Sequence, residues 1–466
     1  MFNPENQYRC DIIRSKSTKQ MDDLLPAYAS IISQLCPLDK QSFKISIQNE
    51  LANLLFKEDY DNLEDNNQKT VDNHRTEIAG KLFGMFYEKE NIIYESESTT
   101  KLLEDNDQPA FFKNLCLNFQ FPNGTQAIQT VQKRIDDKIH FKPFHYILTL
   151  LNEAKKVNLV LTKTEIGYYV LNSLEVLQGR INTTVVLNKI IEDRNNGIFK
   201  KITLIKNSSW TFQHISGQIN LLLLANLIRV EEDNVYLNSL EKTTLNLFYH
   251  QLSQPLAFDI YGYNLDSVEG RKEMYQNWSE YYSKVNVPNY NLLSTTIEAL
   301  QQKVEEPIKE TKQGIDHTIL GDEGEEYVFN IEKERVTLFN PRLTNKVIML
   351  GKQRGIGYDI SSVEANENIE EPEFARFIEV KSTKRTTVPS LEDKSWVDTI
   401  NLTRKEWVAA KQYKTAYNIY RVYFTPNETI IRKINNPFEK NENGIISVLP
   451  TMYRMDFFSK SIDKQY

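Results

Sequence analysis

Apolar residues recur at helical spacing through the first 135 residues of the chain. Two sets each follow one face of a helix: Met21, Leu24, Leu25, Tyr28, Ile31, Ile32 and Leu35, and then Ile78, Leu82, Phe83 and Phe86. Two acidic stretches, 58–65 and 95–107, are predicted to be solvated loops. We therefore expect residues 1–135 to form a mostly helical region.

The pattern between residues 136 and 250 predicts helices followed by a β-hairpin. Residues 144–154 are amphipathic, and Thr162 with Glu165 has the spacing of a capping box at the start of the next helix. Residues 219–227 are apolar enough for a buried helix, and residues 228–237 alternate around a polar turn. Helices followed by a hairpin are typical of a winged-helix domain, so we expect DNA recognition here.

A basic cluster within this region is a candidate DNA-binding surface. Residues 141–210 contain ten Lys and Arg against five Asp and Glu. The residues predicted to contact phosphates are Lys189, Arg194, Lys200, Lys201 and Lys206. An ordinary basic surface would explain the same cluster, and the sequence does not choose between the two.

The rest of the chain is predicted to form a connector and a last domain. Residues 251–314 contain aromatic-rich helices and then a polar stretch with Pro307 and Gly314, which is typical of a linker. Residues 315–466 follow as one domain, in which Thr403 with Glu406 has the spacing of a second capping box. A length of 466 residues suits about three domains, and the pattern as a whole indicates a multidomain α+β protein.

The clearest strand pattern lies at residues 376–383. Alternation places Glu379 and Lys381 on one face of this strand, and Asp359 precedes another predicted strand. Two carboxylates from adjacent strands can hold a divalent ion through oxygen ligands, which suits Mg²⁺ or Mn²⁺. Such an ion lowers the pKa of an attacking water. Lys381 would orient that water or stabilise developing negative charge.

Composition argues against several other kinds of site. The three cysteines form no C-x-x-C pair, and the six histidines include no H-E-x-x-H motif. We therefore expect no disulfide framework, zinc finger or His-built zinc site, and we predict a cytoplasmic location. No apolar run approaches the ~18 residues of a membrane span, so no membrane partner and no signal peptide are expected.

The formal net charge of −7 seems to argue against a nucleic-acid partner. However, the acidic residues are concentrated in the stretches 58–65, 95–107 and 364–373 and at the predicted metal site. Affinity for nucleic acid depends on local phosphate contacts rather than on the total charge. The charge of the whole chain therefore does not exclude DNA.

Residues 320–425 resemble the PD-(D/E)XK nucleases, and more narrowly the nuclease-related domain at the C-terminus of NO VEIN proteins. The resemblance rests on five motifs in order: Gly324-Glu325 with Val328, Gly357-Tyr358-Asp359-Ile360, residues 377–383, residues 402–407 and residues 417–423. One departure is Tyr358, which stands where the simplest signature has proline. The resemblance implies a C-terminal α/β restriction-endonuclease-like core, with a mixed central sheet flanked by helices.

The resemblance also implies roles for individual residues. Asp359 and Glu379 would be metal ligands, Lys381 the catalytic lysine, and Glu325 the acid supplied by a helix, with the adjacent Glu326 left as an alternative. From the sequence alone, Lys384 and Arg385, just beyond the strand, are predicted to be exposed charges that either contact phosphates or have no role. No motif identifies the family of the first 300 residues.

Together these features predict a sequence-specific, Mg²⁺-dependent endonuclease of a bacterial restriction or phage-defence system. Its expected partner is double-stranded DNA, with a homodimer on DNA and a cognate methyltransferase as further candidate partners. The alternatives are a catalytically silent DNA-binding or assembly subunit and a nuclease that acts on RNA. Recognition sequence, cleavage position and sensitivity to methylation are not encoded in any recognisable motif.

Overall fold

The computed structural model describes residues 2–13, 16–200, 208–284, 290–301, 320–350, 356–366, 371–389 and 396–448. The chain divides into two compact units, which are described separately below. Unit 1 comprises Met1–Leu320, Ser382–Ile400 and Val422–Ile430, and unit 2 comprises Gly321–Lys381, Asn401–Arg421 and Ile431–Tyr466. The predicted linker at 303–314 lies outside the described residues, and the predicted domain boundaries stay predictions.

The first part of unit 1 contains both helices and a small sheet. Its helices are α1 (Thr18–Leu35), α2 (Lys40–Phe56), η1 (Tyr60–Asn62), α3 (Asp65–Asn73), η2 (His74–Leu82), α4 (Glu97–Asp105), α5 (Gln108–Asn118) and α6 (Ile128–Asp136). Its strands, in the order β1-β3-β2, are β1 (Leu38–Asp39), β2 (Phe86–Lys89) and β3 (Ile92–Glu95). The placement of Phe86 on a helix was therefore wrong, because Glu90 and Asn91 adopt positive φ and turn β2 into β3. The stretch 95–107 is also mostly helix α4 rather than a loop.

The middle of unit 1 contains the predicted helices and hairpin. Helix α7 (Pro143–Lys156) is followed by β4 (Leu161–Thr162), α8 (Lys163–Glu165), η3 (Ile166–Leu171), α9 (Leu174–Leu177), α10 (Thr183–Asn195) and α11 (Ser208–Leu224). The capping box of Thr162 and Glu165 is confirmed at the start of α8. The predicted hairpin is β5 (Ile228–Glu231) with β6 (Asn234–Leu237), and β4 joins it in the order β4-β6-β5.

The remaining helices of unit 1 are α12 (Lys242–Leu252), η4 (Ile260–Gly262), α13 (Val268–Ser283), η5 (Asn291–Leu293) and α15 (Ile297–Gln301). One continuous cluster of buried apolar side chains extends from Cys10 to Leu293. Much of its volume is aromatic, and Phe83, Phe111 and Phe112 form a set of edge-to-face contacts.

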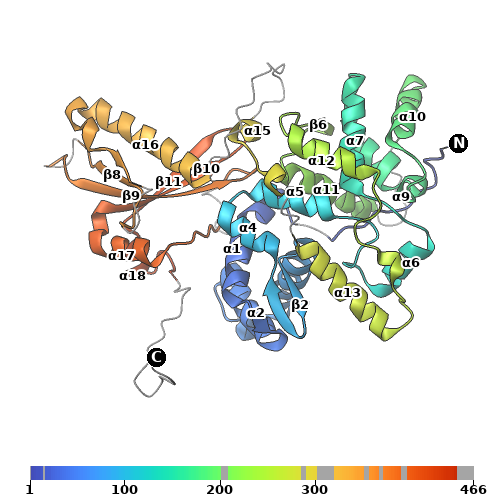
Figure 1. The fold of residues 1–466 in the computed structure, drawn as a ribbon, viewed down its shortest axis with the longest axis horizontal. Coiled ribbons are helices and arrows are strands. Elements are labelled where there is room, and N and C mark those ends of the chain that lie inside the picture. The colour runs from blue at the N-terminus through green and yellow to red at the C-terminus, as the bar shows by residue number, and fades with distance from the viewer. Residues whose placement is uncertain are drawn as a thin grey trace, which may run out of the picture. The chain divides into compact units, whose positions relative to one another are not determined.

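The C-terminal sheet has five strands in the order β11-β10-β9-β8-β7 and lies between helices (Figure 1). Its strands are β7 (Ile348–Met349), β8 (Ile360–Val363), β9 (Ala375–Lys384), β10 (Tyr417–Phe424) and β11 (Thr429–Asn435). The helices are α16 (Leu320–Phe339), η6 (Pro341–Lys346), α17 (Arg404–Tyr413), η7 (Lys414–Ala416) and α18 (Pro437–Glu442). The expected α+β mixture with a mixed C-terminal sheet is confirmed. The parts of β9, β10 and β11 that belong to unit 2 carry the predicted site.

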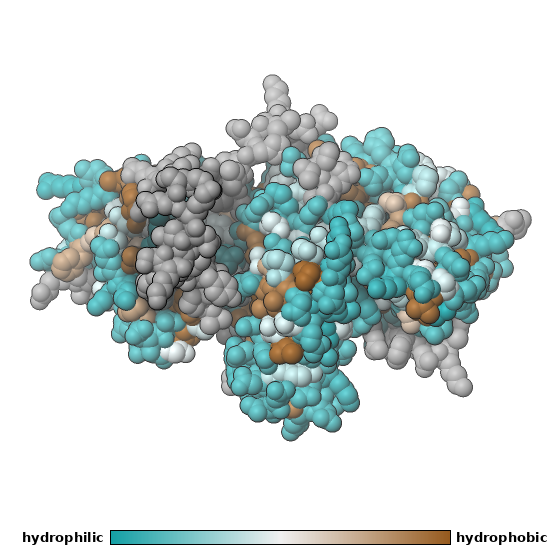
Figure 2. All heavy atoms as spheres, turned by 60° about the horizontal axis from the view of Figure 1, so that its bottom comes forward, coloured by the Kyte–Doolittle hydropathy of each residue, from teal (hydrophilic) through white to brown (hydrophobic). Residues whose placement is uncertain are grey.

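On the face drawn in Figure 2, hydrophilic residues dominate, and hydrophobic ones form scattered spots. No helix within the described ranges combines the length and the apolar character needed to cross a membrane.

Candidate functional site

Strands β8 and β9 bring the two predicted metal ligands together. The strands pair antiparallel with Ile360 opposite Ile378, and the N–H of Asp359 donates to the carbonyl of Ile378 at 2.9 Å. This register makes Asp359 and Glu379 cross-strand neighbours on one face of the sheet. The carboxylate of Asp359 also accepts the N–H of Val380 at 2.8 Å. The carboxylate pair expected from the sequence is therefore formed.

Lys381 lies on the same face and contacts two acids. Its Nζ is 2.6 Å from Oε1 of Glu379 and 2.9 Å from Oε2 of Glu406. Glu406 stands in the first turn of α17, where it forms the predicted capping box with Thr403. The sequence prediction assigned Glu406 only this capping role. Its contact with Lys381 was missed because a capping box gives no indication of what else its acid contacts.

Burial and mutual repulsion change the acidity of these groups. Burial, together with the charges of Asp359 and Glu406, raises the pKa of Glu379 to about 9 against the opposing effect of Lys381. Burial also raises the pKa of Asp359. Burial alone would lower the pKa of Lys381, but Glu379 and Glu406 raise it above its ordinary value. At neutral pH the lysine is therefore an ammonium group, and the Glu379 carboxylate takes up a proton at a higher pH than an exposed glutamate does.

The raised pKa of Glu379 predicts a pH-dependent stability in the absence of divalent ions. Between its unfolded value near 4.5 and its folded value near 9, the unfolded chain binds fewer protons than the folded one. Raising the pH therefore favours unfolding, by at most about 1.4 kcal/mol per pH unit for a single group. Urea denaturation in EDTA at pH 5, 7 and 9 should show this fall for the native chain and a shallower one for Glu379→Gln. Parallel curves would contradict it.

Helix α16 covers the opposite face of the sheet (Figure 1). The buried carboxylate of its Glu332 accepts hydrogen bonds from Ser362 of β8 at 3.0 Å and Tyr420 of β10 at 2.8 Å. Strand alternation places Ser362 on the face opposite Asp359 and Glu379.

This placement bears on the choice between Glu325 and Glu326. Glu325 precedes Glu332 by seven residues and so lies on the same helix face, about 10.5 Å along α16. Glu325 is half-buried on the face of α16 that carries Glu332, whereas Glu326 is exposed. The helix phase favours Glu325 of the two, and its catalytic role stays a prediction.

The residues present can be tested for their fit to a divalent ion. Within the described part of the chain, no group of three or more His, Cys, Asp and Glu side chains has the geometry of a metal site. The fit therefore rests on two carboxylates, Asp359 and Glu379. These are hard oxygen donors from adjacent strands, and both have raised pKa values. A cation between them would relieve their repulsion, and such a donor set suits Mg²⁺ or Mn²⁺.

Gly357 sets the spacing between the approach to β8 and helix α17. Its φ of +86° lies in the region that favours glycine, and a Cβ atom there would be 2.7 Å from the carbonyl oxygen of Lys405. The carbonyl of Gly357 accepts the hydroxyl of Tyr417 at 2.9 Å. A strand approach and a helix start therefore touch backbone to backbone beside the carboxylate pair.

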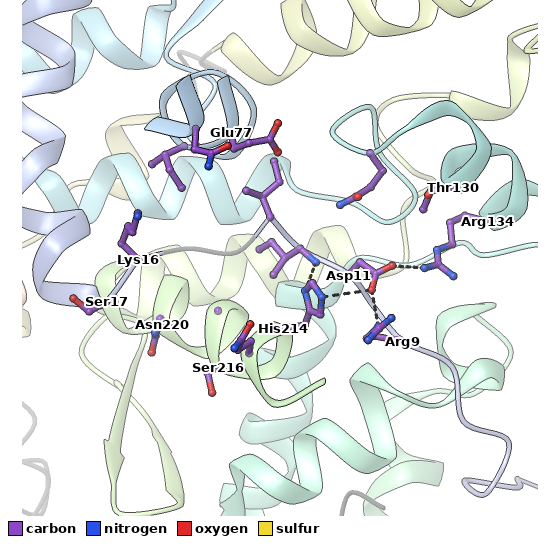
Figure 3. Close-up of a pocket in the computed structure, with 17 residues that line it drawn as sticks. Arg9, Asp11, Lys16, Ser17, Glu77, Thr130, Arg134, His214, Ser216 and Asn220 are labelled. Atoms are coloured by element: carbon purple, nitrogen blue, oxygen red, sulfur yellow. Dashed lines mark hydrogen bonds and ion pairs between the residues drawn. The ribbon is translucent and has the colours of Figure 1, made fainter. Parts of the chain in front are cut away.

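Unit 1 contains a second candidate site, a polar groove of about 1060 Å³. Asp11 lies at its centre, where it pairs with Arg9 at 2.9 Å, with Arg134, and with Nε2 of His214 at 3.8 Å (Figure 3). Three residues of α11 that line the groove at helical spacing are Gln213, Ser216 and Asn220. These three residues form a polar stripe on α11. Their spacing was visible in the sequence, because polar positions recur there between the apolar positions of a buried helix.

The basic residues predicted to bind DNA lie elsewhere. Lys189, Arg194 and Lys200 do not line the groove. Their cationic groups pair within the chain, Lys189 with Glu192 at 2.9 Å, Arg194 with Glu165 at 2.6 Å, and Lys200 with Glu5. Lys201 and Lys206 lie outside the described residues. Phosphate contact by this cluster stays a prediction.

The interpretation of Lys384 and Arg385 as exposed charges was wrong. Both residues are buried. The backbone N–H of Lys384 donates to Asn106 at 3.2 Å, and the guanidinium of Arg385 pairs with Asp22 at 3.6 Å and with Asp23, all within unit 1. These partners are more than 270 positions away in sequence, so no local sequence pattern predicts the contacts.

Comparison with known proteins assigns both ends of the chain. The family described as "Restriction endonuclease BpuJI - N terminal" matches residues 2–279, which is more than half of the chain. The chain belongs to this family. The family described as "Protein NO VEIN, C-terminal" matches residues 324–434, in agreement with the resemblance seen in the sequence. The BpuJI N-terminal family thus accounts for the region that no sequence motif had identified.

A solved structure supports the BpuJI assignment. The structure is titled "Crystal structure of pyrene- and phenanthrene-modified DNA in complex with the BpuJ1 endonuclease binding domain". Its chain is 46% identical over 61% of the present chain and 100% of its own length, with a TM-score of 0.57. No curated protein matches the present chain significantly.

Proposed function

We propose that this protein is a Mg²⁺-dependent DNA endonuclease of a bacterial restriction or phage-defence system. The observation that carries the proposal is the cluster of Asp359, Glu379 and Lys381 on one face of the C-terminal sheet. Membership of the BpuJI N-terminal family adds a DNA-binding unit, because the related solved domain is in complex with DNA. Recognition and hydrolysis would then belong to separate parts of one chain.

In the proposed mechanism each residue of the cluster has one task. Asp359 and Glu379 would hold the ion, and the bound ion would supply a water of lowered pKa and polarise the phosphate. Lys381 is protonated because two acids raise its pKa, so it cannot accept a proton from water. Its ammonium group would instead donate to the reacting phosphate and stabilise the negative charge that develops there.

The groove of unit 1 is the proposed DNA-reading surface. Amide side chains pair with adenine, and arginine pairs with guanine, in the major groove of DNA. The stripe of Gln213, Ser216 and Asn220 supplies such groups on α11, with Arg9 and Arg134 beside it. Helix α11 is the last helix before the β5–β6 hairpin, the position of the recognition helix in a winged-helix domain. The winged-helix interpretation is part of this proposal.

We expect Gln213→Ala to weaken binding to the preferred DNA sequence by about 1–3 kcal/mol and to leave binding to random duplex nearly unchanged. A side chain that reads a base edge contributes to sequence discrimination, whereas phosphate contacts act on every sequence. The preferred sequence can be selected with the native chain from a random library. Gln254→Ala, an exposed amide outside the groove, is the matched control. An equal effect of both variants would contradict the assignment of the groove.

The test of the proposed function is digestion of modified and unmodified plasmid, followed by sequencing of the ends. Cleavage with Mg²⁺ and none with EDTA is expected, and protection by methylation would point to a cognate methyltransferase. A double-strand break needs two scissions, so a homodimer on DNA is also proposed and can be measured by ultracentrifugation with a duplex. Cleavage of RNA instead would replace DNA as the substrate.

Two observations favour the alternative of a silent DNA-binding subunit. Lys381 pairs directly with Glu379, and the described residues contain no metal-type cluster of three acids or histidines. Tight binding of DNA without any cleavage in Mg²⁺ or Mn²⁺ would establish this alternative.

A further inference from the structure

Glu406 contacts Lys381 from α17, although neither the sequence motifs nor the comparisons give it a role in the site. Its side chain enters from α17, on the face of the sheet that carries Asp359, Glu379 and Lys381. The ring of Tyr413 on α17 packs on Phe377 of β9, with centroids 4.3 Å apart, which confirms that α17 covers this face. Glu325, by contrast, belongs to the helix on the other face.

We propose that Glu406 is the helical acid of this site and acts as a positioning residue for Lys381. This proposal rests on the proposed nuclease function. Oε2 of Glu406 accepts the N–H of Thr403 at 3.0 Å and lies 2.9 Å from Nζ of Lys381. The same oxygen therefore contacts both the first turn of α17 and Lys381. The capping contact holds the carboxylate in place, and the carboxylate in turn holds the ammonium group of Lys381.

The reason for a second acid follows from the two partners of Lys381. Glu379 contacts the lysine at 2.6 Å but is also a proposed ion ligand. An acid that holds an ion can no longer hold the lysine equally well. Glu406 keeps Lys381 on this face whether or not Glu379 is engaged. Its side chain is only 14% exposed, so solvent screens the pair weakly.

Two variants separate positioning from helix capping. Glu406→Gln removes the charge but keeps a side-chain oxygen for the cap, because glutamine also completes a capping box. Thr403→Ala removes the hydroxyl that accepts the N–H of Glu406 at 3.3 Å, and it leaves the carboxylate in place. If Glu406 only caps α17, Thr403→Ala should lower cleavage more than Glu406→Gln does. If Glu406 positions Lys381, Glu406→Gln should lower cleavage more than Thr403→Ala does.

The experiment has one readout without metal and one with it. In EDTA, reductive methylation of Lys381, followed by mass spectrometry of the full-length chain, should be several-fold faster in Glu406→Gln than in the native chain and near native in Thr403→Ala. With Mg²⁺ and plasmid DNA, kcat of Glu406→Gln should fall about 100-fold with KM unchanged. Thermal unfolding should show Glu406→Gln no less stable than Thr403→Ala.

Native methylation and native cleavage by Glu406→Gln would overturn the proposal. Lower thermal stability of Glu406→Gln than of Thr403→Ala would also overturn it, because Glu406 would then act through the fold. If the native chain cuts no nucleic acid, the nuclease function fails, and the methylation rates in EDTA still decide whether Glu406 holds Lys381.

Discussion

Replacing Glu379 or Lys381 by alanine is expected to lower Mg²⁺-dependent cleavage by about 10²–10³-fold or more, because Glu379 would hold the ion and Lys381 would act on the reacting phosphate. Binding to duplex DNA should persist, since the proposed recognition groove lies in unit 1. Plasmid cleavage in Mg²⁺ and fluorescence anisotropy of labelled duplex in EDTA measure the two quantities separately. The chain therefore should become a DNA-binding protein that does not cut.

The matched control for this prediction is another Lys–Glu pair of unit 2. Lys346 pairs with Glu373, and the two side chains are 44% and 60% exposed. Lys346→Ala and Glu373→Ala change the same charges away from the cluster, so cleavage should stay near the native rate. Native cleavage by Glu379→Ala and Lys381→Ala would show that the site is assigned to the wrong residues.

Replacing Lys113 by methionine is expected to destabilise unit 1 by about 3–5 kcal/mol. The Lys113 side chain is fully buried, and its Nζ lies 2.8 Å from Oε2 of Glu241 and 2.8 Å from Oγ1 of Thr295. The other oxygen of Glu241 accepts Asn226 at 2.7 Å. Methionine fills similar space but leaves the buried Glu241 carboxylate without its cation. The loss of this cation accounts for most of the expected destabilisation.

Urea denaturation measures this effect, and two further variants sharpen it. The double variant Lys113→Met with Glu241→Met removes both charges and should recover part of the loss. Lys101→Met breaks the exposed pair with Glu104, whose side chains are 37% and 53% exposed, and should cost less than about 1 kcal/mol. A loss from Lys113→Met no larger than that from Lys101→Met would contradict the importance of the buried network.

The sequence predicted those elements that depend on interactions between residues close together in the chain. The two capping boxes begin helices at Thr162 and Thr403, and the strand at 376–383 forms within β9. Phe86 was misplaced because an apolar residue at helical spacing fits a helix or the start of a strand equally well. The turn at Glu90 and Asn91 was the available signal, since asparagine tolerates positive φ in a two-residue hairpin.

The candidate site was predictable only in part for the same reason. Asp359, Glu379 and Lys381 follow from strand alternation and from a known signature, so their convergence could be foreseen. The burial of Arg385 could not, because it depends on Asp22 and Asp23 near the other end of the chain. The pairing of Glu406 with Lys381 depends on how α17 packs on the sheet, which a one-dimensional pattern does not record.

The close approach of Gly357 to Lys405 makes position 357 sensitive to substitution. Any side chain at this position would force the carbonyl of Lys405, and with it the first turn of α17, away from the strand. The acid that holds Lys381 would leave with that turn, whereas most of the sheet and all of the groove would be unaffected. Under the proposed function, a single substitution at Gly357 would therefore abolish cleavage and leave DNA binding intact.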